Sequence, residues 1–231
     1  MQIAIAPPPK VLPPPAMPRT HPVPLADTRF RQLLGESGWS RLPAAIRKRF
    51  GKRLRQGDSV AYQGVVTGMQ MNRAGWLLAQ AARLIGAPLP YDRSCLGHPA
   101  VVIVTEDPAT NGQFWIRQYG RARGFPQMVH SSKRFAGPTG LEEYIGYGIG
   151  MALRVEATAH ALLFKSDHYF LQWGQRRIRL PRMFSPGALV IGHHDLGEGQ
   201  FAFTLVLRHR LFGQLIAQDA VFHDAVQRGQ G

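Results

Sequence analysis

The second half of this chain is a long series of short strand-like segments, and this feature constrains the fold more than any other. From about residue 98, segments rich in Val, Phe, Tyr and Ile follow one another, broken by Gly, Pro or Asp turns. No helix-length periodic segment lies between them, which excludes a doubly wound α/β fold. The spacing predicts strands near residues 99–106, 113–121, 126–135, 141–149, 151–164, 167–173, 176–180, 187–196, 199–209 and 212–223.

The segment before this series has the periodicity of helices. Within residues 27–56, Asp27 or Thr28 suits the start of a first helix that Gly35 ends, and Pro43 suits the first turn of a second helix. One apolar stripe recurs every four residues in the second helix: Leu42, Ile46, Phe50 and Leu54. A strand over residues 59–71 and a short apolar helix over 74–86 follow. The expected fold class is β-dominated (α+β), a highly curved antiparallel sheet or barrel with a short helical N-terminal part.

Three parts are expected along the chain. Residues 1–26 contain two proline triplets, and because proline fixes φ and lacks an N–H donor, we expect a disordered, Pro-rich arm. Residues 27–225 form a single β-rich domain, and residues 226–231 a disordered tail. Cys95 is the single cysteine, and no apolar run reaches the roughly 18 residues of a membrane helix, so we expect a cytoplasmic protein.

The chain is strongly basic, with a formal net charge of +14 that comes mostly from arginine. Such a charge attracts anions, although biased codon usage alone can also produce it. The densest basic patch lies on the second predicted helix and consists of Arg47, Lys48, Lys52, Arg53 and Arg55. It predicts either weak contact with an anionic membrane or the solvated face of a docked helix. Nucleic-acid binding is not expected, because the aromatic-plus-basic strand motifs of RNA-binding folds are absent.

Two predicted strands carry polar faces that suit a ligand. In the first, Trp115, Arg117 and Tyr119 share one face, with two aromatic rings flanking one guanidinium. In the second, Arg154, Glu156, Thr158 and His160 share a face opposite Leu153 and Val155. Both faces would suit the lining of a cavity that holds a carboxylate or phosphate beside an apolar body. Both also suit cross-strand ladders exposed to water.

Motifs with defined chemistry are missing from the sequence. A nucleophile elbow, a phosphate-binding loop and a zinc-protease motif are all absent. The glycines of residues 146–150 do not have dinucleotide-binding spacing and are interpreted as a sharp bend within a strand. Cys95 with His98 forms a possible nucleophile, although single cysteines usually fill cores. His193 and His194 are adjacent, so on a strand they point to opposite faces and cannot share one metal ion. No metal, cofactor or catalytic residue is predicted.

Several distinctive segments follow one another in a fixed order: residues 42–46 (Leu-Pro-Ala-Ala-Ile), 114–120 (Phe-Trp-Ile-Arg-Gln-Tyr-Gly), 140–143 (Gly-Leu-Glu-Glu), 173–174 (Trp-Gly), 179–181 (Arg-Leu-Pro), 197–203 (Gly-Glu-Gly-Gln-Phe-Ala-Phe) and 211–215 (Leu-Phe-Gly-Gln-Leu). In this order they resemble the bacterial domain-of-unknown-function family DUF4166. The resemblance spans roughly residues 27–223. It implies a domain that also occurs joined to NAD-binding domains similar to saccharopine dehydrogenase. It implies no catalytic residues, because the family has none assigned.

Two functions from different classes follow. The first is a binding module that holds a small amphipathic or anionic ligand, lipid-like or a carboxylate, through Trp115, Arg117, Tyr119, Arg154, Glu156 and His160. The alternative is an enzyme, or an accessory domain of an NAD-dependent oxidoreductase, that uses Glu156 and His160 as an acid–base pair. Residues four apart on a strand lie roughly 13 Å apart, so this pair would need a wide pocket.

Overall fold

The computed structural model of the protein describes residues 26–54, 58–174 and 176–224. The predicted arm and tail, and Arg55 of the basic patch, lie outside these residues, apart from Ala26 at the end of the arm. Ala26 forms an isolated antiparallel bridge with Lys52.

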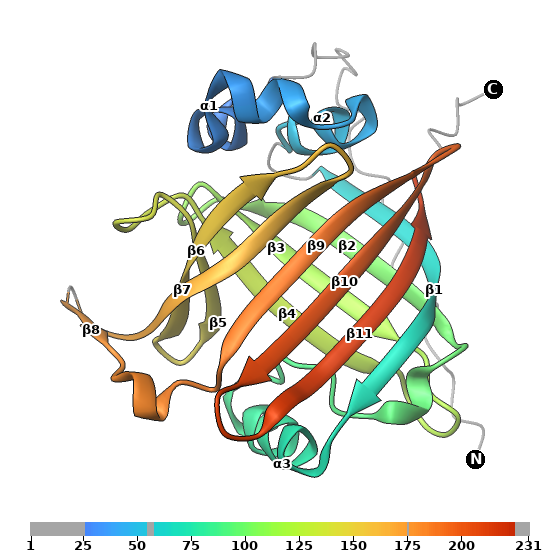
Figure 1. Cartoon of the computed structure of the whole chain (residues 1–231), viewed down its shortest axis with the longest axis vertical. Helices are drawn as coiled ribbons and strands as arrows, with labels where there is room; N and C mark the ends of the chain where they lie inside the picture. Colours follow the sequence, from blue (N-terminus) through green and yellow to red (C-terminus); the bar gives the residue numbers. More distant parts are fainter. Residues whose placement is uncertain (1–25, 55–57, 175, 225–231) are drawn as a thin grey trace, which may run out of the picture.

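In the described residues, one antiparallel sheet contains all the named strands. They are β1 (Ser59–Met71), β2 (Pro99–Asp107), β3 (Gly112–Tyr119), β4 (Gln127–Arg134), β5 (Glu142–Gly146), β6 (Ile149–Ala157), β7 (Ala161–Trp173), β8 (Arg176–Arg179), β9 (Ala188–Gly197), β10 (Gln200–His209) and β11 (Gly213–His223). The order across the sheet is β6-β5-β4-β3-β2-β1-β11-β10-β9-β7-β8, and β6 also pairs with β7. That last pairing closes ten strands into an up-and-down barrel and leaves β8 outside (Figure 1). The prediction of a curved antiparallel barrel is confirmed.

Two turns differ from the predicted boundaries. The chain reverses at residues 158–160, where Thr158 Oγ1 accepts hydrogen bonds from His160 N at 3.2 Å and Ala161 N at 2.9 Å. The predicted break between residues 164 and 167 is therefore wrong, and β7 runs through it. The glycines near residue 146 form a two-residue hairpin turn and not a bend within a strand, since Tyr147 and Gly148 have φ of 51° and 81°.

Helices cover both ends of the barrel (Figure 1). At one end lie α1 (Arg29–Arg41), which Gly35 interrupts at φ 68°, and α2 (Ala44–Phe50). At the other end lie α3 (Arg73–Ala82) and the 3-10 turn η1 (Arg83–Ile85), with η2 (Arg93–Cys95) and η3 (Arg182–Phe184) in nearby loops. The whole predicted stripe of α2 is buried, but the helix ends at Phe50, so the prediction that it continues to residue 56 is wrong.

Aromatic side chains fill the barrel near α1 and α2. Phe50 of α2 packs edge-on to Phe30 at 5.1 Å between ring centroids and lies 5.8 Å from Phe164 of β7. Trp115 of β3 stacks on Phe50 at 6.3 Å, and Phe201 and Phe222 stack on each other nearby at 5.5 Å. This end of the interior is a packed core.

The opposite end is covered by a helix that lies unusually close to the sheet. Asn72 caps α3 because its Oδ1 accepts a hydrogen bond from Gly75 N at 2.7 Å. Gly75 then contacts β11 so closely that a Cβ there would lie 2.1 Å from Leu215 O. In the part of the chain that the structure describes, no helix is long and apolar enough to cross a membrane.

Candidate ligand cavity

The barrel is hollow between its centre and α3. The cavity measures about 470 Å³ and is walled mainly by aliphatic side chains. Ala74, Leu78 and Ala82 of α3 form one wall, and the strands supply the others, including Met151, Leu189, Ile191, Leu205 and Leu207. The polar residues on the lining are Arg117, Glu143, Tyr169, Ser185 and His209. An apolar space with a few polar groups is the usual form of a small-molecule site.

Arg117 and Glu143 belong to a buried polar cluster at the inner end of this cavity. Alternation along β3 turns Arg117 inward together with Trp115 and Tyr119, and the same alternation turns Ser131 and Lys133 of β4 inward. Register places Lys133 directly opposite Glu143 of β5. Three neighbouring strands therefore deliver four polar side chains to one point inside the barrel.

Glu143 is the centre of the cluster. Its Oε2 accepts a hydrogen bond from Lys133 Nζ at 3.0 Å, and its Oε1 accepts one from Ser131 Oγ at 2.5 Å. Arg117 Nη2 lies 3.5 Å from Oε1, and Arg117 Nη1 donates to Ser131 Oγ at 3.3 Å. All four residues are buried.

Burial and the neighbouring charges both shift the pKa values of Glu143 and Lys133. Burial alone would raise the pKa of the Glu143 carboxyl, but Lys133, Arg117 and the Ser131 hydrogen bond lower that pKa to about 2. Burial lowers the pKa of Lys133, and Arg117 lowers it further, while Glu143 opposes both. Glu143 is therefore a carboxylate at neutral pH and stabilises the charged form of Lys133.

The cluster contains two basic side chains and one carboxylate. Arg117 and Lys133 face one carboxylate, which leaves an excess of one positive charge when Lys133 is protonated. Among the described residues, Arg117 Nε is also buried without a hydrogen-bond partner. A buried excess charge and a buried unpaired donor are both unfavourable, so the cluster has the electrostatics of a site for one anion.

The comparison with protein families agrees with the sequence resemblance. Residues 42–222 match the family described as "Domain of unknown function (DUF4166)". The chain belongs to this family. The match runs from α2 to β11 and so includes every strand that carries the cluster. Comparisons with curated proteins and with solved structures found no match.

The first predicted face of this DUF4166 domain lies inside the barrel. Trp115, Arg117 and Tyr119 expose 5%, 4% and 1% of their surfaces. Of the three, only Arg117 lines the cavity. Trp115 lies behind the cluster, with its ring centroid 4.9 Å from Lys133 Nζ and 5.9 Å from Arg117 Cζ.

The second predicted face lies outside, so the prediction that Arg154 shares the concave side with Arg117 is wrong. Arg154 exposes 71% of its side chain and pairs with Asp167 at 2.7 Å, and Glu156 pairs with Lys165 on the same outer surface. His160 is exposed in the β6–β7 turn. The physical reason is that the apolar partners on the other face, Leu153 and Ala157, occupy the interior.

Only part of the predicted basic patch lies on α2, because this helix ends at Phe50. Arg47 and Lys48 lie on the helix, whereas Lys52 and Arg53 follow it. Arg53 Nη2 donates to Asn111 Oδ1 at 2.5 Å. Arg49, on the same helix, is held by Asp224 at 2.6 Å and Asp195 at 3.7 Å.

Two further candidates, Cys95 with His98 and the pair His193 and His194, have surroundings in the described residues that disfavour reactive chemistry. Cys95 is fully buried beside the Gln218 amide, and burial raises the pKa of its thiol, which disfavours the thiolate. His193 points into the aromatic core and His194 points outward to Thr204, as alternation requires. Burial, together with Lys133, Arg49 and Arg117, holds the pKa of His193 well below its usual value.

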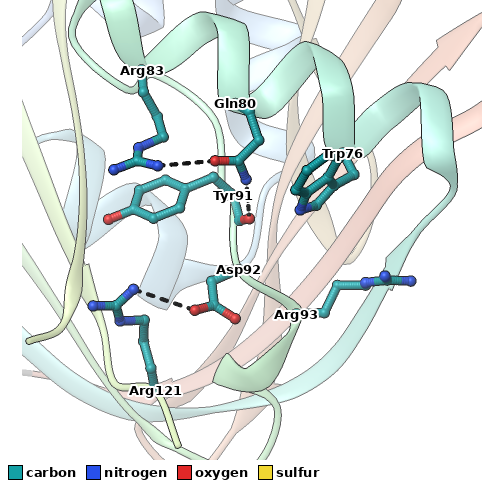
Figure 2. A pocket seen from close by; sticks show the side chains of 7 residues that line it. All are labelled: Trp76, Gln80, Arg83, Tyr91, Asp92, Arg93 and Arg121. Carbon is teal, nitrogen blue, oxygen red and sulfur yellow. Dashed lines mark hydrogen bonds and ion pairs between the residues drawn. The ribbon is translucent and has the colours of Figure 1, made fainter. Parts of the chain in front are cut away.

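A second hollow, of about 360 Å³, lies on the outer side of α3 (Figure 2). Most of its charged groups are already paired. Arg121 Nη1 lies 3.3 Å from Asp92, and Arg83 donates to Gln80 at 3.0 Å while its guanidinium covers the Tyr91 ring at 4.8 Å. The barrel cavity is therefore the stronger candidate site.

Sequence reasoning missed Ser131, Lys133 and Glu143. One signal was present, because Glu142 and Glu143 are adjacent on a strand and one of them must face inward. Glu142 faces outward and pairs with Arg177 of β8 at 2.9 Å, which leaves Glu143 inside.

Proposed function

We propose that this domain is a binding module for a small amphipathic acid. The observation that carries the proposal is the cluster of Arg117, Lys133 and Glu143, in which two basic side chains share one carboxylate at the inner end of an apolar cavity. A carboxylate bound there would balance the charge, and an apolar chain would fill the space toward α3.

The head of the ligand would bind at Arg117. This residue lines the cavity, presents a guanidinium fork and has a buried Nε without a partner in the described chain. Charge-assisted hydrogen bonds from a guanidinium to a carboxylate are among the strongest in proteins. Lys133 lies behind Glu143 and would act by keeping the cluster positive.

The size and walls of the cavity suit the body of the ligand. A volume of 470 Å³ lies within the roughly 300–1,000 Å³ of typical ligand pockets. Burying one methylene against aliphatic walls contributes about 0.8 kcal/mol, so a medium-length alkyl chain would supply most of the affinity.

The acid–base alternative receives no support from the geometry. Glu156 and His160 lie outside the barrel, so they share no cavity with each other or with the cluster. An oxidoreductase partner stays a prediction, because no described contact bears on it.

Titration calorimetry with two probes tests the proposal. Dodecanoate carries the charge, and dodecanol has the same chain without it. Wild type should bind dodecanoate more tightly than dodecanol. Arg117→Met should weaken dodecanoate binding by about 1.5–3 kcal/mol, the scale of a hydrogen bond to a charged group, and leave dodecanol nearly unchanged.

Arg154→Met is the matched control, since it removes an arginine from the outer surface. It should leave both affinities unchanged. Equal binding of dodecanoate to wild type and Arg117→Met would reject the proposal. Native mass spectrometry of material that co-purifies with the protein would then identify the natural ligand class.

A further inference from the structure

The cavity is bordered by apolar side chains that are exposed to water. Met183 and Phe184 of η3 and Phe212 of the β10–β11 turn line the cavity, yet they expose 79%, 69% and 59% of their surfaces. Leu211 beside Phe212 and Leu84 of η1 each expose 83%. We call these five residues the mouth patch. In Figure 1 the three segments that carry it, η3 in orange, the β10–β11 turn in red and the α3–η1 region in green, all lie at the lower end of the barrel.

Basic residues are concentrated in the segments that carry the mouth patch. The segments 73–86, 176–187 and 208–214 contain no Asp or Glu. Their arginines are Arg73, Arg83, Arg176, Arg177, Arg179, Arg182, Arg208 and Arg210. Arg83, Arg182 and Arg210 are next to patch residues in sequence and are exposed. An apolar patch with a basic rim matches the surface of an anionic bilayer, which offers acyl chains beneath negative headgroups.

A second copy of the chain would be a poor partner for this surface. Two such rims would bring like charges together, which costs free energy and disfavours self-association. The opening of a ligand cavity is also where an amphipathic acid must enter and leave, and such acids partition into membranes.

We propose that the mouth patch docks on an anionic lipid surface, so that the amphipathic ligand passes between the bilayer and the cavity without crossing open water. The purpose of this docking rests on the proposed function, but the docking itself can be tested separately. Met183, Phe184, Leu211 and Phe212 insert among the headgroups, and Arg83, Arg182 and Arg210 bind the lipid phosphates.

Co-sedimentation with vesicles tests the docking. The vesicles are phosphatidylcholine alone and an equimolar mixture of phosphatidylcholine and phosphatidylglycerol. We expect binding to the mixed vesicles that weakens as salt is raised, and little binding to the neutral ones. The double variant Arg182→Glu/Arg210→Glu should bind at least about tenfold more weakly, because each basic residue near an anionic surface strengthens the attraction. The double variant Phe184→Ser/Phe212→Ser should show a similar loss of affinity for the mixed vesicles.

The control variant lies at the opposite end of the barrel. Arg47→Glu/Lys48→Glu changes the same number of charges on α2 and should keep wild-type vesicle binding. If this variant loses binding instead, the α2 end is the contact and the proposal is overturned. Absence of vesicle binding at low salt, or a dimer that Arg182→Glu/Arg210→Glu abolishes, would overturn it too.

Dodecanoate titration without vesicles separates this proposal from the proposed function. Arg182→Glu/Arg210→Glu should still bind dodecanoate in solution, since Arg117 is intact. If the wild-type protein binds vesicles but does not bind dodecanoate, the proposed function of the cavity is rejected and the proposed docking surface is supported.

Discussion

Lys133 Nζ lies 3.0 Å from Glu143 Oε2, and the two side chains expose only 1% and 3% of their surfaces. The two residues are direct partners across β4 and β5, so the register of one strand pair fixes their contact. Arg117 approaches the same carboxylate. The loss of stability caused by a substitution in this cluster should therefore depend on which charges the substitution leaves unpaired.

Removal of Glu143 should be much more destabilising than removal of Lys133. Glu143→Gln removes the carboxylate that stabilises the charged forms of Arg117 and Lys133, and it should lower the free energy of unfolding by about 3–5 kcal/mol. Lys133→Met leaves Arg117 and Glu143 as a balanced pair and should cost less. Urea denaturation at neutral pH measures both. Equal losses of unfolding free energy in the two variants would show that charge balance does not determine the contribution of the cluster to stability.

His193 should make the protein sensitive to mild acid. Its pKa in the folded protein is held well below the ordinary value of 6.5 by burial and by nearby cations. A group with a depressed folded-state pKa contributes stability that is present above the unfolded-state pKa and lost as pH falls. The free energy of unfolding of the wild type should therefore decrease below about pH 6.5.

His193→Phe is the variant that checks this pH dependence. The ring lies among Phe50, Phe203 and Trp115 at 5.0, 5.4 and 5.6 Å, and its Nδ1 has no partner in the described residues. Phenylalanine should therefore fit, and the loss of stability between about pH 6.5 and 5 should shrink. Urea denaturation across this range gives the result. An unchanged slope would assign the acid sensitivity to another group.

The alternation within single strands was predictable, but the contacts between strands were not. Trp115, Arg117 and Tyr119 share one face by period two alone, and the structure confirms that this face is internal. Arg154 and Glu156 also share a face as predicted, yet alternation cannot tell inside from outside. The apolar residues opposite them decided that question. Lys133 and Glu143 meet through register, which a single sequence does not specify.

Gly75→Ala should destabilise the protein, although alanine normally favours a helix by about 1 kcal/mol. A Cβ at this position would lie 2.1 Å from Leu215 O, so α3 would have to move away from β11. We expect a loss of about 1–3 kcal/mol by urea denaturation. Gly38→Ala in α1 is the control variant. Its new Cβ would meet only side-chain atoms, the nearest being Leu34 Cβ at 3.2 Å. A gain of stability in Gly75→Ala would contradict the close packing of α3.

Two alanines of α3, Ala79 and Ala82, lie about one turn apart and have different surroundings. Ala82 lines the cavity, whereas Ala79 is fully buried and does not line it. Ala82→Leu would place three more carbons in open apolar space, so the free energy of unfolding should stay the same or rise by up to roughly 2 kcal/mol. The same change at Ala79 enters packed interior and should cost about 1–3 kcal/mol.

Ligand binding should separate the two variants as well. Ala82→Leu should weaken the binding of both dodecanoate and dodecanol, because the leucine side chain occupies the space of the alkyl chain. Arg117 is unchanged in this variant. This pattern differs from that of Arg117→Met, which should affect only the charged probe. Calorimetry on both variants and both probes therefore distinguishes the apolar wall from the anion site. If Ala82→Leu is stable and binds both probes as wild type does, the ligand does not occupy the space beside α3.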